Sequence, residues 1–465
     1  MRRRFHTYLR IALALYGLQL FGQDPPPEPD EDQAARQAWF YSQRAFPLGT
    51  IPPGARLNAI TQLNRIDQAA RARRQQAAAQ RPRDSRLALT ADAQNWTQIG
   101  PQPTGGGTVA ATAGRINAIA VDPRDNNTAY LAAAEGGVWK TTDGGVTWTP
   151  LTDQQASLAS GAIAIDPANP DTIYVGTGEE NFSGDSYYGA GILKSTDCGA
   201  SWTQILGPFL RDTIGVLVVS PAGNGVLLCA AATGLWRSSD GGASWTQTLT
   251  GGPATSVAFD PTDGSSAYAA LGSPTGSSRN GVYHSTDGGV TWQKLSGGFP
   301  SVSAGRISLA IAPSQPGTIY AQVSDASVGG FGFLLGIWKT DDSGATWNAL
   351  PIPNRTIWGN EQWYDIPIAV SPADPNVVYS GGLLIQRSLD GGATWSALPQ
   401  SGASGQILHV DQHVFTFTAD ATKLYIGNDG GAYSTADFAA PRVAWTPLND
   451  TLSITQFYPG MSIDP

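Results

Sequence analysis

The sequence predicts an all-β protein, a β-propeller of four-stranded antiparallel blades. Six near-copies of the motif Ser/Thr-x-Asp-x-Gly-x-Ser/Thr-Trp follow one another, and a weaker seventh copy contains Thr435, Asp437 and Trp445. From Trp148 to Trp445, successive motif tryptophans are 54, 43, 47, 55, 48 and 50 residues apart, a self-similarity that indicates a repeat architecture. The 55 glycines and 32 prolines disfavour helix. We therefore expect seven complete blades and the start of another, after a short helical or disordered N-terminal leader.

Each repeat also contains an apolar run that ends in Asp-Pro or a close equivalent and is followed by a tyrosine. In the first repeat, residues 119–121 have the small apolar side chains of an inner strand, and Asp122-Pro123 begins a polar turn. Residues 128–133, 137–141 and 147–151 follow as the second, third and fourth strands. Four short strands in a repeat of this length are typical of a propeller blade.

The aspartates of the motif are predicted to stabilise turns rather than to catalyse a reaction. Each carboxylate can accept hydrogen bonds from its own turn, the glycines permit positive φ, and the tryptophan supplies apolar surface between blades. The six structural aspartates are Asp143, Asp197, Asp240, Asp287, Asp342 and Asp390.

These motifs resemble the Asp-boxes, or bacterial neuraminidase repeats, of sialidases, sortilin-type receptors, xyloglucan hydrolases and photosystem II assembly factors. The resemblance extends over about residues 96–465. It implies a propeller fold, and it leaves the reaction open because one fold supports many functions.

Three regions are expected along the chain. Residues 1–22 are a basic stretch followed by about twelve apolar residues, the layout of a signal peptide and too short to span a bilayer. Residues 23–94 form a linker and a leader with two helix-like stretches, 33–44 and 55–80, and residues 95–465 form the propeller. Trp96 to Ile99 resembles a lone outer strand and Met461 to Pro465 a lone inner strand, so we expect the propeller to be truncated at its C-terminus.

Composition agrees with an exported protein, secreted or held in the periplasm or cell envelope. The net charge of -9 argues against nucleic acid as a partner. The two cysteines, Cys198 and Cys229, fall at peripheral and interior positions, which makes a disulfide between them unfavourable. We expect a monomer with no cofactor and with no transmembrane segment after signal removal, whose partner is a glycan or a protein.

The residues that depart from the repeat are expected on one face of the propeller. Loops that lead into inner strands, and loops between second and third strands, open on the face opposite the Asp-box turns. Arg115 and Arg306, each between Gly and Ile, also precede inner strands, and their recurrence predicts a structural role. The candidate binding residues on this face are Glu179, Asp185, Tyr187, Tyr188, Trp363, Tyr364, Asp365, His409, Asp411, Asn428 and Asp429.

One segment of this face carries candidate ligands for a metal. On an extended strand, His409, Asp411 and His413 would lie on one side. Imidazole and carboxylate groups serve both metal sites and acid/base pairs, and the alternative is that they hydrogen-bond adjacent blades. The candidate catalytic residues are Asp411, His413, Asp365 and Glu179.

Two classes of function remain open. A glycoside hydrolase, sialidase-like or xyloglucanase-like, would need paired carboxylates on this face. The chain departs from both hydrolase patterns, because Arg115-Ile116 is followed by Asn117 rather than proline, and Ala134 and Glu135 precede Gly136 where a catalytic aspartate is expected. These departures favour a binding or assembly module that recognises a carbohydrate or a protein.

Overall fold

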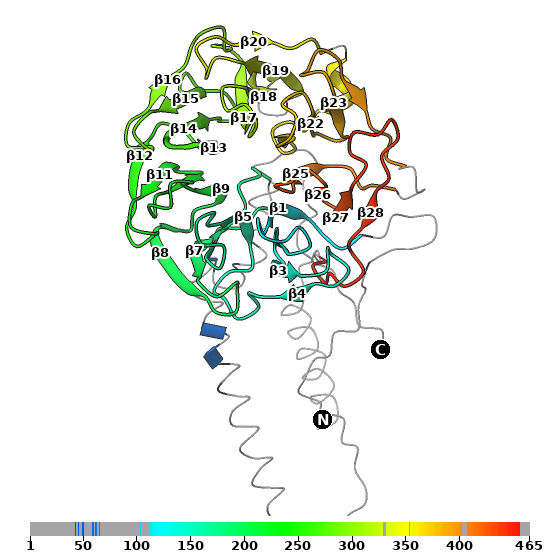
Figure 1. Ribbon diagram of the computed structural model, residues 1–465. Helices are drawn as coiled ribbons and strands as arrows, with labels where there is room; N and C mark the ends of the chain where they lie inside the picture. Colours follow the sequence, from blue (N-terminus) through cyan, green and yellow to red (C-terminus); the bar gives the residue numbers. More distant parts are fainter. Residues whose placement is uncertain are drawn as a thin grey trace, which may run out of the picture. The chain divides into compact units, whose positions relative to one another are not determined.

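The computed structural model describes residues 112–455, except 184, 329–331, 353 and 402–406, together with a few isolated earlier positions. These residues form seven four-stranded antiparallel sheets arranged in a ring (Figure 1), which confirms the predicted fold class. The chain separates into two compact units, and the propeller belongs to the unit that contains residues 56–182 and 186–457. The predicted signal peptide, most of the leader and both lone strands lie outside the described residues. Among the residues described, no helix is long and apolar enough to cross a membrane.

The first four blades follow one another along the chain, each with its strands in sequence order from the axis to the rim. Their strands are β1 (Ile116–Val121), β2 (Ala129–Ala133), β3 (Gly137–Thr141) and β4 (Thr149–Pro150); β5 (Ser160–Ile165), β6 (Ile173–Thr177), β7 (Ala190–Ser195) and β8 (Thr203–Leu210); β9 (Ile214–Val219), β10 (Leu227–Ala231), β11 (Gly234–Ser238) and β12 (Thr246–Leu249); β13 (Ala254–Asp260), β14 (Asp263–Leu271), β15 (Gly281–Ser285) and β16 (Gln293–Lys294).

The last three blades repeat this order and include two short 3-10 helices, η1 (Ala326–Val328) and η2 (Arg355–Trp358). Their strands are β17 (Ala304–Ile311), β18 (Ile319–Asp325), β19 (Leu334–Thr340) and β20 (Asn348–Ala349); β21 (Ile368–Val370), β22 (Val378–Ser380), β23 (Gln386–Ser388) and β24 (Ser396–Ala397); β25 (Gln412–Phe417), β26 (Leu424–Asn428), β27 (Gly431–Thr435) and β28 (Thr446–Pro447).

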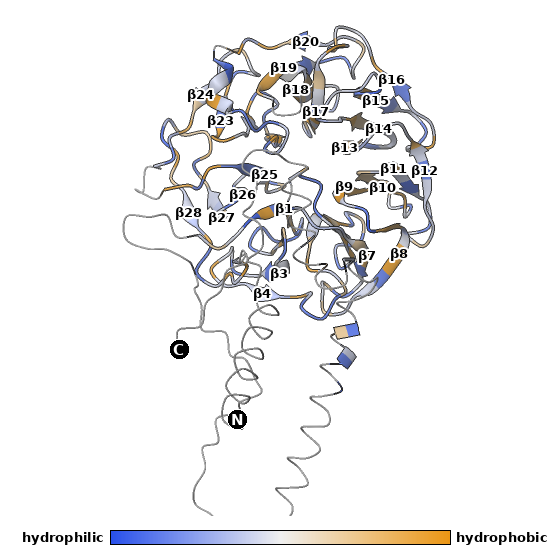
Figure 2. Ribbon diagram, turned by 180° about the vertical axis from the view of Figure 1, so that it is seen from behind, coloured by the Kyte–Doolittle hydropathy of each residue, from blue (hydrophilic) through white to orange (hydrophobic). Residues whose placement is uncertain are grey.

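In the first blade the second strand is the most buried, and the fourth strand lies at the solvent-exposed rim. All five residues of β2 are buried, whereas both residues of β4 are exposed. In Figure 2 the rim strands β16 and β20 have hydrophilic colours. The four strands predicted for the first blade are all present, within a few residues of their expected bounds.

The Asp-box carboxylates hold their turns, as the sequence predicts. In the first box, Asp143 accepts hydrogen bonds from the Thr147 amide at 2.9 Å and from the Thr147 and Thr141 hydroxyls at 2.6 and 2.7 Å. These bonds, led by the Thr147 hydroxyl, lower the pKa of Asp143 to about 2. The same bonding recurs at Asp197, Asp240, Asp287, Asp342 and Asp390.

The tyrosines of the second landmark join one blade to the next. Tyr130, Tyr174 and Tyr268 donate their hydroxyls to backbone carbonyls in the Asp-box turn of the following blade, at 3.0 to 3.3 Å. The tyrosine therefore spans the interface between two blades. Each of these Asp-box turns is held both by its own aspartate and by the tyrosine of the preceding blade.

The seventh blade packs directly against the first. No strand is shared between them, because every sheet is built from consecutive strands. The closure depends on bonds such as Tyr425 Oη to the Asn126 carbonyl at 2.9 Å and Thr416 Oγ1 to the Ile119 carbonyl at 2.9 Å. Seven blades thus complete a ring among the residues that the structure describes. Cys198 and Cys229 are free thiols, as expected.

Candidate functional site

A cavity of about 210 Å³ lies at the axis of the ring, lined by polar and apolar residues from the inner parts of all seven blades. In six of the seven inner strands the pairing register shifts near the first residues, which marks a β-bulge. In each of these six strands one residue displaced from the ladder lines the cavity: Asn117, Gly161, Gly215, Thr255, Arg306 and His413. A bulge frees a side chain from the alternation of the strand and turns it toward the axis. The repeated bulge is therefore the local feature that builds the cavity.

Arg115 joins two loops at one end of the inner strands. Its Nη1 lies 2.7 Å from Glu179 Oε1, and its Nε lies 3.1 Å from Asp429 Oδ1. The side chains of Arg115 and Glu179 are 7% and 0% exposed. This guanidinium therefore bridges two carboxylates from the second and seventh blades, of which Glu179 is fully buried and Asp429 partly buried.

Asp429 is also bonded to two aromatic side chains. His413 Nε2 lies 2.6 Å from Asp429 Oδ1, and the Tyr364 hydroxyl lies 3.1 Å from both carboxylate oxygens. The rings of Tyr364 and His413 meet edge to face at 4.7 Å. Burial opposes ionisation here, but Arg115 and His413 outweigh it and hold the pKa of Asp429 well below its ordinary value. Asp429 is therefore an ionised acceptor for three donors.

Arg306 has the structural role predicted for it. Its Nη1 donates to the carbonyls of Trp363 and Tyr364 at 3.2 and 2.7 Å, and its Nη2 donates to the Glu180 carbonyl and Asn181 Oδ1 at 3.2 Å each. These bonds tie the loop before β21 to the loop after β6. Arg115 differs, since its partners are charged carboxylates.

Glu180 contributes to the cavity wall a buried carboxyl group without a hydrogen-bond partner in the part of the chain that the structure describes. It is 3% exposed and lines the cavity beside Asn181. Neither carboxyl oxygen has a hydrogen-bond partner among the described residues, and the nearby Gly215 amide does not meet hydrogen-bond geometry. Burial raises the pKa of Glu180 well above its ordinary value, against the opposing charge of Arg306. Burial therefore favours the protonated form of the carboxyl group, which can both donate and accept a hydrogen bond.

This buried acid gives a stability prediction. The folded chain keeps a proton on Glu180 that the unfolded chain releases above about pH 4.3, so stability falls as pH rises from that value toward the raised pKa. Glu180→Gln removes this dependence and is expected to make the protein more stable than wild type at pH 7. Urea unfolding between pH 4 and 8 measures it, with the exposed Asp450→Asn as control. If the difference in free energy of unfolding between Glu180→Gln and wild type stays constant across this pH range, Glu180 does not have a raised pKa.

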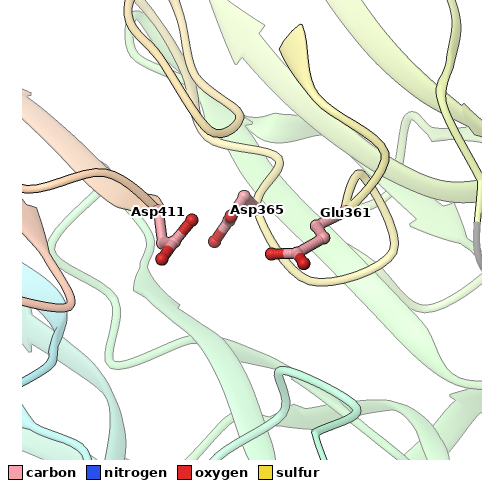
Figure 3. Close-up of side chains that lie close together, drawn as sticks. All are labelled: Glu361, Asp365 and Asp411. Carbon is pink, nitrogen blue, oxygen red and sulfur yellow. The ribbon is translucent and has the colours of Figure 1, made fainter. Parts of the chain in front are cut away.

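Three carboxyl groups gather beside this network, and Figure 3 shows them turned toward one another. One oxygen from each of Glu361, Asp365 and Asp411 lies within 4.8 Å of the others. Asp365 is 0% exposed, and burial, followed by the charge of Asp411, raises its pKa well above the ordinary value. Burial and the charge of Asp429 raise the pKa of Asp411 to about 7. Their separation is shorter than the spacing of about 6.5–9.5 Å that inverting glycosidases need between carboxyls.

Most of the predicted site residues converge as expected. Glu179, Tyr364, Asp365, Asp429 and His413 form one connected network. The Tyr187 carbonyl accepts the Glu179 amide at 3.0 Å, while Tyr188 is half exposed. Asn428 is fully buried and donates to the His409 carbonyl at 3.2 Å, which is a structural role. Asp185 falls with Ser183 in the other compact unit.

The expected alignment of His409, Asp411 and His413 is wrong. Asp411 has a positive φ of 63°, and β25 begins only at Gln412, so residues 409–413 are not one extended strand. The His409 ring lies against Gly430, with Nδ1 3.0 Å from the Val410 carbonyl. His413 turns to Asp429, and Asp411 turns to Asp365 and Glu361. The break in the strand thus divides the predicted trio among different neighbours.

The candidate site residues chosen from the sequence do not include Glu180, Asn117, Asn181 or Glu361. Glu180 and Asn181 flank the chosen Glu179, and Glu361 lies four residues before Asp365. For Asn117, the available signal was its own polar side chain near the start of an apolar inner strand. Its significance depends on the bulge, which has no sequence signature of its own here.

Comparison with known proteins identifies the repeat and the fold. Residues 283–294 match the BNR/Asp-box repeat family. A xyloglucanase from a Paenibacillus species is 30% identical over 136 residues, which span 27% of this chain and 13% of that protein. The match therefore covers a small part of that relative.

Solved structures agree on the architecture. The GH74 enzyme of Niastella koreensis superposes with a TM-score of 0.56 at 21% identity, over 75% of this chain and 56% of that one. The GH74 xyloglucanase of Xanthomonas campestris gives a TM-score of 0.58 at 22% identity, over 73% and 55% of the two chains. This chain is an Asp-box β-propeller that resembles GH74 xyloglucanases in fold.

Proposed function

We propose that this propeller is an exported binding module whose axial cavity takes a neutral, hydroxyl- or amide-bearing end of a glycan or polypeptide. Glu180 carries the proposal. It is buried, neutral and without a hydrogen-bond partner among the described residues, and it lines the cavity. An unsatisfied buried polar group costs about 1–3 kcal/mol, which a ligand hydroxyl or amide would recover.

The size and lining of the cavity favour a small polar group. A volume of about 210 Å³ is below the ~300–1,000 Å³ of sites for drug-sized ligands. The Asn117 and Asn181 amides are bonded to each other at 2.9 Å, and the Thr255 hydroxyl is bonded to the Ile307 carbonyl at 2.7 Å. These bonds hold the wall in place before a ligand arrives. The occupant is therefore one residue at the tip of a longer ligand, such as a terminal sugar or an amide side chain.

Glu180→Leu is expected to weaken binding about tenfold or more, because the ligand group loses both hydrogen-bonding oxygens. The assay is retention of the full chain on arrays of plant, algal and sialylated glycans and of peptides, followed by calorimetry with the best hit. Glu180→Gln, which keeps a donor and an acceptor, should retain most of the affinity, and the exposed Asp450→Leu is the control. Equal binding by wild type and Glu180→Leu would place the ligand elsewhere.

Hydrolysis of a glycan is the second candidate function. The observation that favours it is the partial sequence match to a xyloglucanase, and Asp411 with Asp365 and Glu361 supplies closely spaced carboxyls. Release of reducing sugar from xyloglucan tests it. Turnover that is lost in Asp411→Asn, in a variant that still folds, would establish catalysis, and wild-type protein that releases no sugar would count against hydrolysis of xyloglucan.

A further inference from the structure

We propose that Glu361, Asp365 and Asp411 bind one divalent cation, and that Ca²⁺ is the ion they suit. The three side chains come from two separate parts of the chain. Glu361 and Asp365 belong to the loop before β21, and Asp411 immediately precedes β25 (Figure 3). An ion held by all three would join the sixth blade to the seventh. This site is separate from the axial cavity, whose lining includes none of the three.

The donor set selects the type of ion. One oxygen from each carboxyl group lies within 4.8 Å of the others, close enough for a single ion to contact all three. Hard oxygen donors suit Ca²⁺, Mg²⁺ and Mn²⁺ rather than softer metals. Ca²⁺ accepts irregular arrangements of 6–8 oxygens, whereas Mg²⁺ demands near-ideal octahedral geometry. Because Glu361 and Asp411 are only partly buried, water or a ligand hydroxyl can complete the coordination.

Asp365 supplies an independent reason to expect a ligand. Its side chain is 0% exposed, and neither carboxyl oxygen has a hydrogen-bond partner among the described residues. Buried polar groups without partners are rare, and an ion absent from the coordinates is one recognised explanation. The side chain points into the space between Glu361 and Asp411 (Figure 3). An ion there would satisfy this carboxylate and offset the repulsion among the three groups.

The neighbouring basic groups do not fill this role. His413 Nδ1 lies 3.7 Å from Asp365 Oδ1, beyond hydrogen-bonding distance, while Nε2 is bonded to Asp429. Arg306 directs its Nη atoms to the carbonyls of Trp363, Tyr364 and Glu180 and to Asn181. Neither of these basic groups therefore donates a hydrogen bond to the Asp365 carboxyl group.

The test is calorimetric titration of Ca²⁺ into the full chain after treatment with EDTA, with melting temperature followed in parallel. Wild type is expected to bind about one ion per chain and to melt at a higher temperature with Ca²⁺ present. Glu361→Gln should weaken binding at least tenfold, and Asp365→Asn should abolish it. Asp450→Asn, an exposed acid, is the matched control and should bind like wild type.

Two results would overturn the proposal. One is wild-type protein that takes up neither Ca²⁺, Mn²⁺ nor Mg²⁺ at millimolar concentrations, as expected if Asp365 and Asp411 merely share a proton. The other is uptake that Glu361→Gln leaves unchanged, as expected of ions scattered over an acidic surface. Circular dichroism establishes that each variant folds. If Asp365→Asn does not fold, Ca²⁺ binding by the Glu361→Gln variant, whose substitution lies at a partly buried position, tests the proposal.

Discussion

Trp148→Ala is expected to lower the free energy of unfolding by about 3–5 kcal/mol, the usual cost of removing a buried aromatic ring. The Trp148 side chain is 6% exposed and packs with Leu448, Leu452 and Tyr425 where the first blade meets the seventh. Its indole Nε1 donates to the Leu448 carbonyl at 2.9 Å, and its amide donates to Thr451 Oγ1 at 2.9 Å. Because no strand is shared across this interface, such contacts are what close the ring.

The equivalent residue of the second box is a matched control. Trp202 occupies the same motif position, but it is only partly buried and its Nε1 has no hydrogen-bond partner among the described residues. Trp202→Ala should therefore cost clearly less. Urea unfolding followed by circular dichroism compares the two without depending on tryptophan fluorescence. If Trp148→Ala and Trp202→Ala lower the free energy of unfolding equally, the interface between the first and seventh blades depends on its tryptophan no more than the interface at Trp202 does.

The fold was predictable because the repeat is a strong signal carried by many residues at once. In each Asp-box, an aspartate, a glycine and a tryptophan together predict one turn. The first Asp-Pro pair predicts the end of the inner strand that comes before Asp122. An error at one copy is corrected by the other copies. The role of the landmark tyrosines across blades was not predicted, since it depends on the distance between a side chain and the next blade's turn.

The site was predictable only to the level of a face. Topology alone brings Glu179, Tyr364 and Asp429 together, because each belongs to a loop on the same side of its blade. His409, Asp411 and His413 contact different neighbours because Asp411 has a positive φ. The alternation of side chains along a regular strand does not predict such a break. Likewise, the cavity depends on bulges that displace single residues from the ladder. Backbone irregularities of one residue therefore decide which side chains meet.

The second large effect is expected at Arg115. Arg115→Met should destabilise the protein by about 3–5 kcal/mol, because removing one member of a buried ion pair leaves the other charge uncompensated. Glu179 bears most of this cost. Its side chain is 0% exposed, its Oε2 has no partner among the described residues, and its Oε1 would keep only the Asn181 amide at 2.9 Å. Asp429 would still accept from His413 and Tyr364.

A double-mutant cycle separates the two carboxylates. Adding Glu179→Gln to Arg115→Met should recover about 1–3 kcal/mol, because the buried charge is replaced by a neutral amide, whereas adding Asp429→Asn should recover less. Residues in one buried network are expected to show such coupling. Urea unfolding of the single and double variants at pH 7 gives the coupling energies. If Arg115→Met and Glu179→Gln are additive, the pair is not coupled, and Arg115 would contribute through packing against the Tyr364 ring, 5.3 Å from its guanidinium carbon.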